Sequence, residues 1–307
     1  MSDRRRINGP ASGTQPALFQ HESRTIAQPH RSRKPNELRR LFLQTGLVPA
    51  ASGSAYLELE APRGNKSFVP TTSTIKLSCA IQGPKPLSRN AHFSPNLHLT
   101  ASVKFAPFAT RKRRGYLRDN VERDLGSHLQ NALNGVIIPD RYPKSALEVA
   151  VTVLEGEEDC LWNEDQGQEK GVGGIGLMNV LAASINVAVA ALVDAKIDCL
   201  DMLSAGVAAQ ELSTELLDPC PSEHEELSSA CVVGYLPNRD ELVEVWCKST
   251  IGKVSDSTSE DLINAATKAA RGTYKVLTEV IKESLEQKSK LETAISKEVP
   301  ADDSMKT

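Results

Sequence analysis

Closely spaced cysteines are missing from this 307-residue sequence, which contains no C-x-x-C pair. Its six histidines are spread out in the same way. Structural zinc sites need clustered ligands, and secreted disulfide frameworks need many cysteines in a short chain. We therefore expect no metal site, no cofactor and a reducing compartment. The six cysteines are Cys79, Cys160, Cys199, Cys220, Cys231 and Cys247.

A strong net charge and a secretory signal are lacking too. The formal net charge is −3, so any basic surface must be local. The first forty residues contain no apolar run of the kind that a signal peptide needs, which predicts a protein that stays inside the cell. The apolar stretch 175–193 nearly has the length of a membrane span. Because Asn179, Ser184 and Asn186 interrupt it, we expect a buried core helix and no membrane.

The composition divides the chain into three parts. Residues 1–34 are basic and lack apolar periodicity, which predicts a disordered tail. Its RSRK segment at 31–34 is typical of a nuclear-import signal, an RNA-contacting arm or a solvated tail. Residues 35–290 have a globular pattern, interrupted by an acidic insertion at about 156–172. Residues 291–307 are charged and are expected to form a flexible tail.

Apolar periodicity predicts both strands and helices. Alternating residues predict strands, and two further strands should form a hairpin around a turn at 237–240. One helix is predicted at 177–194 and another from about Ser259, with Ser257 and Glu260 as a capping box, to about Leu285. Strands precede a long helix twice, which predicts an α+β fold of sheets packed against helices rather than alternating βαβ units. The first four strands are expected at 54–60, 74–81, 96–105 and 146–154.

Two stretches imitate ligand sites without the required context. GVGGIG at 171–176 matches G-x-G-x-x-G, but an acidic loop rather than a strand precedes it, which favours a loop feeding a helix over a nucleotide site. The acidic stretch 155–169 offers carboxylates to Mg²⁺, but flexible acidic loops usually stay hydrated and serve solubility or docking. No Ser/His/Asp or Cys/His arrangement indicates a nucleophilic enzyme.

The block RKRRGYLR at 111–118 is the strongest candidate for binding. Cations that point into one groove neutralise several phosphates, and Tyr116 adds a ring on which a base can stack. The alternative is an exposed loop whose cations contact acids of a neighbouring subunit. A helix should follow it, with an apolar stripe of Leu117, Val121, Leu125, Leu129 and Leu133. The candidate RNA-binding residues are Arg111, Lys112, Arg113, Arg114 and Arg118.

Several motifs in a fixed order resemble the RNase PH family over about residues 36–285. The pattern R-x5-G-x4-A-x-G-S-A runs from Arg40 to Ala55, A-x-x-G-P covers 80–84, and A-L-x-D-A-x-I covers 191–197. The resemblance implies an RNase PH-like fold with mixed sheets packed against helices. Active members of that family shorten RNA from its 3′ end with phosphate and hold a metal.

The sequence departs from the pattern of the active members of that family. The resemblance places the arginine that seats phosphate near Leu117, with its hydroxyl neighbour near Arg118. It places an aspartate of the metal centre at Thr152, and Glu157 replaces an Asp-Gly-Gly turn. An apolar side chain cannot hold an oxyanion, and threonine supplies no fixed negative charge. The resemblance therefore implies a non-catalytic member.

Non-catalytic members of this family occur in the ring of the eukaryotic RNA exosome, and the acidic insertion and long tail resemble its mRNA-transport-regulator type of subunit. The resemblance implies as partners other RNase PH-like ring subunits, S1-type cap proteins, RNA and a separate nuclease, in the nucleus, nucleolus and cytoplasm. Two alternatives remain open. One is an active phosphate-dependent 3′–5′ exoribonuclease, and the other is a free-standing RNA-binding protein.

Overall fold

A computed structural model describes most of the predicted globular part and little of the tails. Arg111, Lys112, most of the basic tail and most of the acidic insertion lie outside the described residues. The described residues are 31–61, 73–87, 94–110, 113–157, 174–211, 214–224, 227–249 and 256–298.

A five-stranded sheet forms the first layer, with the strand order β1-β2-β3-β5-β4. On β5, Val151 and Val153 are buried, whereas the intervening Thr152 is only half-buried. This alternation gives the sheet one apolar face for the core and one open face. All four strands predicted in this part are confirmed. The strands are β1 (Leu41–Thr45), β2 (Gly53–Glu60), β3 (Ser73–Pro86), β4 (His98–Phe105) and β5 (Ser145–Glu155).

Helix α1 (Asn120–Asn134) connects two parallel neighbours of this sheet, β4 and β5. The expected α+β plan holds, because β4, α1 and β5 form a single βαβ unit and the other neighbouring strands are antiparallel. Parallel strands need such a crossover connection. Leu125, Leu129 and Leu133 are buried as predicted, but the helix begins at Asn120, so Leu117 precedes it and is 75% exposed.

A four-stranded sheet forms the second half of the fold, with the order β7-β6-β8-β9. The predicted hairpin is confirmed, since β8 and β9 are antiparallel neighbours on either side of residues 237–240. All neighbouring strands in this sheet are antiparallel. Its strands are β6 (Ser204–Glu211), β7 (Thr214–Leu217), β8 (Ser229–Leu236) and β9 (Glu241–Ser249).

Helix α2 (Ile175–Asp194) lies between the two sheets, and almost its whole circumference is buried. Among the described residues it is the one helix long and apolar enough to cross a membrane, but 94% of that stretch is buried inside the fold. A helix that is apolar on all sides needs partners on all sides. The predicted core helix is therefore confirmed by its burial.

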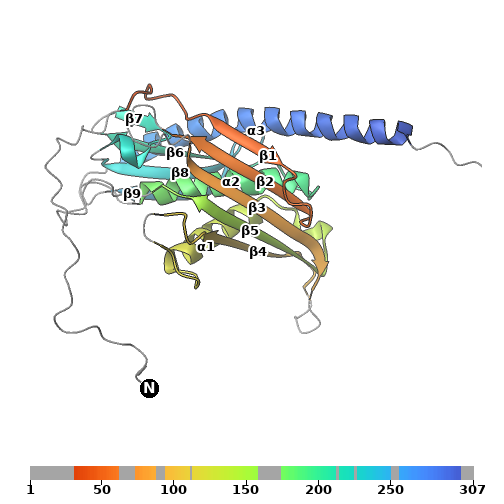
Figure 1. The fold of residues 1–307 in the computed structure, drawn as a ribbon. Coiled ribbons are helices and arrows are strands. Elements are labelled where there is room, and N and C mark those ends of the chain that lie inside the picture. Colours follow the sequence, from red (N-terminus) through yellow and green to blue (C-terminus); the bar gives the residue numbers. More distant parts are fainter. Residues whose placement is uncertain are drawn as a thin grey trace, which may run out of the picture.

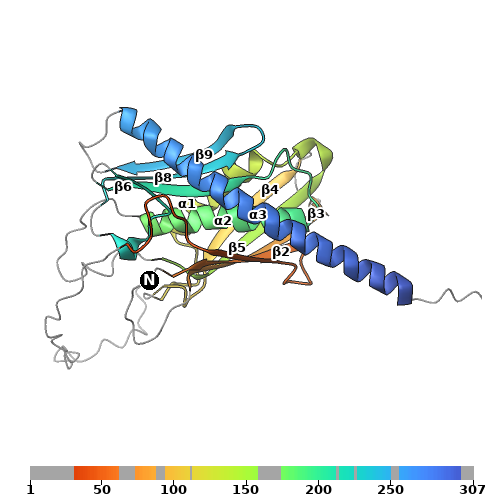
Figure 2. The same ribbon diagram turned by 90° about the horizontal axis from the view of Figure 1, so that it is seen from above.

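Helix α3 (Asp256–Glu298) packs on the outer face of the second sheet. It crosses the molecule diagonally, and its last turns project beyond both sheets (Figures 1 and 2). The predicted boundaries were too narrow. The helix already includes Ser257, which is therefore not its N-cap, and it continues past Leu285 to Glu298. Helical propensity in the charged segment carries it past the end of the apolar stripe.

The most specific sequence motifs meet where β2 begins and α2 ends. Gly53 lies so close that a Cβ there would come within 2.4 Å of the backbone nitrogen of Ala195. The backbone N–H of Ser54 donates a hydrogen bond to a carboxylate oxygen of Asp194 at 2.9 Å. The opening and closing motifs therefore join the first sheet to the core helix.

The approach of α3 to β6 requires a glycine at position 206. A Cβ at Gly206 would meet the backbone nitrogen of Ala270 at 2.3 Å and the carbonyl oxygen of Ala266 at 2.7 Å. We predict that Gly206→Ala lowers the free energy of unfolding by about 1–3 kcal/mol, since the helix must move outward. Urea denaturation measures this. Gly115→Ala is the control, because nothing lies within 4 Å of a Cβ there; equal effects of the two substitutions would contradict the prediction.

Candidate nucleic-acid interface

The loop before α1 is anchored by one buried carboxylate, that of Glu122. This side chain is 1% exposed and accepts hydrogen bonds from the backbone N–H of Phe105 at 2.9 Å and of Asp119 at 3.2 Å. The ammonium of Lys104 also donates to it at 3.1 Å. Glu122 thus joins the end of β4 to the start of α1 as part of a capping box.

Lys104 extends this anchor to the basic loop itself. Its ammonium donates to the carbonyl oxygens of Gly115 at 3.3 Å and of Tyr116 at 3.0 Å. The backbone of the loop is therefore held by a side chain of β4. A charged donor satisfying two carbonyls fixes the loop more firmly than neutral hydrogen bonds would.

The outward side of the loop combines cations with exposed rings. Tyr116 is 91% exposed, Phe108 is 74% exposed and Leu117 is 75% exposed, and Arg113 and Arg118 of the same loop are exposed too. Aromatic faces beside guanidinium groups are the combination that holds single-stranded nucleic acid through stacking and phosphate contact. We call Phe108, Arg113, Tyr116, Leu117 and Arg118 the loop patch. The sequence analysis missed Phe108, although its place beside the basic block was a visible signal.

Arg114 differs from its neighbours because it packs against the fold. Its guanidinium lies 4.5 Å from the centroid of the Phe105 ring, and it pairs with Asp119 at 3.5 Å. Its side chain is only 22% exposed. Of the five predicted RNA-binding residues, Arg113 and Arg118 are open to solvent. Arg111 and Lys112 lie outside the described residues.

A second cluster of charges, centred on Arg39, is buried between the two sheets. The Arg39 side chain is 1% exposed and donates to both carboxylate oxygens of Asp218, at 2.9 and 2.6 Å. It also donates to the hydroxyl of Thr74 at 3.0 Å and pairs with Glu157. Burial opposes its charge, but Asp218 and Glu157 outweigh burial and raise the pKa of Arg39 well above its usual value.

Glu157 belongs to this buried cluster, which corrects the expectation that its acidic stretch is hydrated throughout. Its carboxylate accepts hydrogen bonds from Thr74 at 2.7 Å and from the side-chain amide of Asn179 at 2.6 Å, besides its pair with Arg39. The Glu157 side chain is 4% exposed. The part of the stretch beyond it, from residue 158, lies outside the described residues.

Two arginines from the predicted basic tail also enter the cluster. Arg33 donates to Glu223 at 2.7 Å and to Asp218 at 3.3 Å, and Arg31 donates to the carbonyl oxygen of Leu217 at 2.7 Å. Their side chains are 11% and 7% exposed. The predicted disordered tail was therefore too long at its C-terminal end, because these cations find buried acids. Neither arginine is available as an RNA-contacting arm in this structure.

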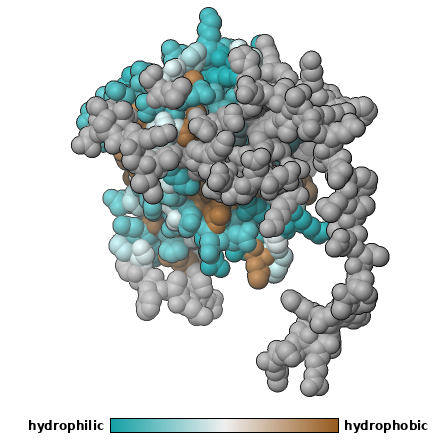
Figure 3. All heavy atoms as spheres, turned by 90° about the vertical axis from the view of Figure 1, so that its left-hand side faces the viewer, coloured by the Kyte–Doolittle hydropathy of each residue, from teal (hydrophilic) through white to brown (hydrophobic). Residues whose placement is uncertain are grey.

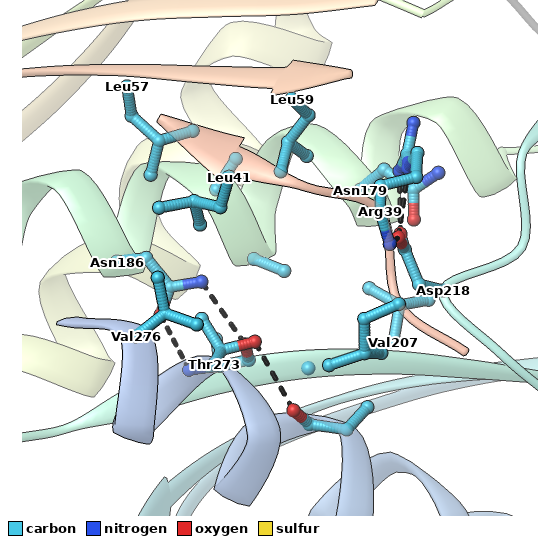
Figure 4. A pocket seen from close by; sticks show the side chains of 16 residues that line it. Arg39, Leu41, Leu57, Leu59, Asn179, Asn186, Val207, Asp218, Thr273 and Val276 are labelled. Atoms are coloured by element: carbon cyan, nitrogen blue, oxygen red, sulfur yellow. Dashed lines mark hydrogen bonds and ion pairs between the residues drawn. The ribbon is translucent and has the colours of Figure 1, made fainter. Parts of the chain in front are cut away.

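A cavity of about 80 Å³ adjoins the Arg39 cluster, between β1, β2, α2, β6 and α3. Figure 4 shows Arg39 and Asp218 paired at one end, and Leu41, Leu57 and Val276 along the walls. Small-molecule sites usually occupy about 300–1,000 Å³, so this cavity is too small for a nucleotide.

The residues matched to catalytic positions do not form a metal site in the described part of the chain. Thr152 lies on the open face of the first sheet, opposite Ser78 and Lys104 on the neighbouring strands. No group of three or more His, Cys, Asp or Glu residues suited to a metal occurs among the described residues.

Figure 3 shows a mainly hydrophilic face with small, separate hydrophobic areas wherever its residues are described.

Comparison with known proteins points to one family. The sequence matches the model of the 3′ exoribonuclease family, domain 1 (RNase PH), over residues 37–198. It is 42% identical over 292 residues to exosome complex component MTR3 of Chaetomium thermophilum, covering 93% of this chain and 100% of that protein. It is 29% identical over 250 residues to exosome complex component MTR3 of Homo sapiens, covering 76% of this chain and 79% of that protein.

Solved structures confirm the predicted fold. Rice Rrp46 matches with a TM-score of 0.61 and 17% identity, covering 81% of this chain and 98% of that chain. A chain of the Archaeoglobus fulgidus exosome with RNA bound to the active site matches with a TM-score of 0.59 and 14% identity, covering 79% of this chain and 90% of that chain. At these identities the likeness concerns the fold alone, and the expected RNase PH-like α+β architecture is confirmed.

The Arg39 cluster makes stability depend on pH through Asp218. Burial alone would raise the pKa of Asp218, but Arg39 and Arg33 outweigh burial and hold it well below its usual range. A lowered folded-state pKa contributes stability that is complete above about pH 4 and is lost as the pH falls further. We predict that Asp218→Asn costs about 3–5 kcal/mol at pH 7, because Arg39 keeps its charge without its main partner.

Urea denaturation between pH 7 and pH 3 measures this effect. The difference in free energy of unfolding between the native chain and Asp218→Asn should be constant down to about pH 4 and should narrow below it. Asp140→Asn, in the exposed segment η1 (Pro139–Arg141), is the matched control and should differ little from the native chain at any pH. A gap that stays constant to pH 3 would exclude the charge of Asp218 as the cause.

Proposed function

Because the chain belongs to the 3′ exoribonuclease (RNase PH) family, we propose that it is a non-catalytic ring subunit of the RNA exosome. In this role it helps to build the central pore and guides RNA 3′ ends toward a separate nuclease during RNA processing, including that of ribosomal RNA, and RNA degradation. The observation that carries the proposal is the joint similarity to the family and to two proteins named exosome complex component MTR3.

The absence of catalysis is supported by the chemistry at the matched positions. Glu157 is bound by Arg39, Thr74 and Asn179, so its oxygens already have partners. Thr152 offers a neutral hydroxyl on the open face of the sheet, and Leu117 is apolar. Phosphorolysis needs groups that stabilise developing negative charge, and each such group typically contributes several kcal/mol.

RNA contact is assigned to the loop patch and to the adjoining Arg111 and Lys112. Exposed guanidinium groups bind backbone phosphates without reading sequence, and the rings of Phe108 and Tyr116 stack on bases of any kind. This combination suits a subunit that passes many RNAs along. Arg114, which the sequence also indicated, has a supporting role because it holds the loop against Phe105 and Asp119.

The proposed partners are other RNase PH-like ring subunits, S1-type cap proteins and the associated nuclease, besides RNA. The proposed location is the nucleus and nucleolus, and also the cytoplasm. An active phosphate-dependent 3′–5′ exoribonuclease is the second candidate function. It is favoured by the family match alone, since the family model is that of 3′ exoribonucleases.

Phosphorolysis by the assembled ring separates the two functions. We predict that Thr152→Ala leaves the release of nucleoside diphosphates from RNA and inorganic phosphate unchanged, because the neutral hydroxyl at this position takes no part in a reaction. The measurement is nucleoside diphosphate production by a ring reconstituted with each variant. Ser78→Ala, beside Thr152 on the open face, is the control. Loss of release with Thr152→Ala, but not with Ser78→Ala, would make this chain an enzyme.

Charge reversal in the loop patch tests the RNA contact. We predict that a ring reconstituted with the double variant Arg113→Glu, Arg118→Glu binds single-stranded RNA about tenfold or more weakly at low salt. The difference should be much smaller at high salt, because salt screens phosphate contacts. Fluorescence anisotropy of labelled RNA at several salt concentrations measures it. The double variant Arg141→Glu, Arg239→Glu makes the same change of charge at exposed positions elsewhere and should bind normally. Failure of the ring to assemble would instead place the loop patch at a subunit interface.

A further inference from the structure

Two cysteines face each other across the hairpin of β8 and β9. Cys231 and Cys247 are direct partners in the antiparallel register, and their sulfur atoms are 2.6 Å apart. Directly opposed residues in an antiparallel pair have Cα atoms about 4.5–5.5 Å apart, and disulfides span about 4.4–6.8 Å. The backbone therefore already brings the two thiols within bonding range.

The two thiols differ in their access to solvent. Cys231 is fully buried among apolar residues that pack against α3. Cys247 is exposed, because it lies on the edge strand of the sheet. The contact between the two thiols lowers the pKa of Cys247, whereas the same contact and burial raise the pKa of Cys231. One sulfur is thus accessible and more readily ionised, and the other lies directly behind it.

We propose that Cys231 and Cys247 are a reversible redox pair, oxidised to a disulfide by low-molecular-weight disulfides such as glutathione disulfide. The Cys247 thiolate attacks one sulfur of glutathione disulfide, which forms a mixed disulfide and releases one glutathione. The Cys231 thiol, losing its proton, then attacks the Cys247 sulfur and releases the second glutathione. The chain loses two electrons and two protons, which the two released glutathione molecules carry.

Such a bond would act on the contact between the two halves of the fold. Strand β9 carries Glu244 and Trp246, which hold His128 of α1: His128 pairs with Glu244 at 2.6 Å and stacks on Trp246 at 5.0 Å between ring centroids. Oxidation would tie β9 covalently to β8 and so restrict the fraying of this edge strand. Reduction would release it again, in a compartment buffered by glutathione.

The other cysteines in the described part of the chain have no such arrangement. Cys79 and Cys220 are buried, and burial raises the pKa of Cys79. Cys199 is half-buried, and burial raises its pKa to about 11. None of these three is paired in register with another cysteine. The proposed reactivity therefore belongs to the pair and not to thiols of this chain in general.

The test uses the full-length chain, purified under reducing conditions and equilibrated with glutathione buffers of increasing oxidised fraction. Acid quenching, alkylation and peptide mass spectrometry then measure which thiols remain. We expect a peptide pair linked through Cys231 and Cys247, formed within the range of these buffers and removed by dithiothreitol. In Cys231→Ala, a glutathione mixed disulfide should accumulate at Cys247, because the resolving thiol is gone.

Cys199→Ser is the control and should leave the linked peptide unchanged. Cys247→Ser, at an exposed position, should abolish the link and leave Cys231 as a free thiol. The proposal is overturned if both cysteines remain alkylatable in fully oxidised buffer, or if the native chain stops at a mixed disulfide on Cys247. A linked peptide that contains any other cysteine in place of Cys231 or Cys247 would overturn it as well.

Discussion

The burial of the Arg39 guanidinium between two carboxylates is the constraint on which the arrangement of the fold depends. Arg39 comes from the segment before β1, Glu157 from the end of β5, and Asp218 from the segment after β7. A buried cation needs paired charges and hydrogen bonds to offset its desolvation. The two sheets are consequently held in one relative position at this point.

The same cluster fixes the carboxylate of Glu157 at the end of β5. In the described residues, Glu157 is the acidic side chain near the end of β5 that lies deepest, and it is bound by Arg39, Thr74 and Asn179. A carboxylate held by a guanidinium is stabilised in place, whereas a metal ligand needs free lone pairs directed at the ion. The carboxylate of Glu157 thus serves the stability of the fold, and its removal would leave the buried Arg39 cation without one of its partners.

Local apolar periodicity in the sequence predicted most of the strands and helices of the fold. Alternation along β2 to β5 and the all-round apolar character of α2 predicted their burial, because periodicity directly reports which faces meet the core. The positions of Arg31, Arg33 and Leu117 could not be predicted in this way. Two arginines in a polar tail give no local sign of acids nearly two hundred residues away. The spacing of Leu117 continues the apolar stripe of α1, but the helix begins only after its N-cap, Asp119.

In the basic loop, one arginine packs against the fold and two others are exposed to solvent, because the contacts beneath the loop fix its backbone. Lys104 and Glu122 fix the backbone from inside the fold, and Arg114 covers Phe105. Arg113 and Arg118 take no part in these contacts and are open to solvent. A loop held by its own strand and helix presents its cations at a lower ordering cost on binding, since their backbone is already in place and only the side chains must be immobilised. The sequence alone shows five cations without distinction, whereas the anchor packs Arg114 against the fold and leaves Arg113 and Arg118 exposed.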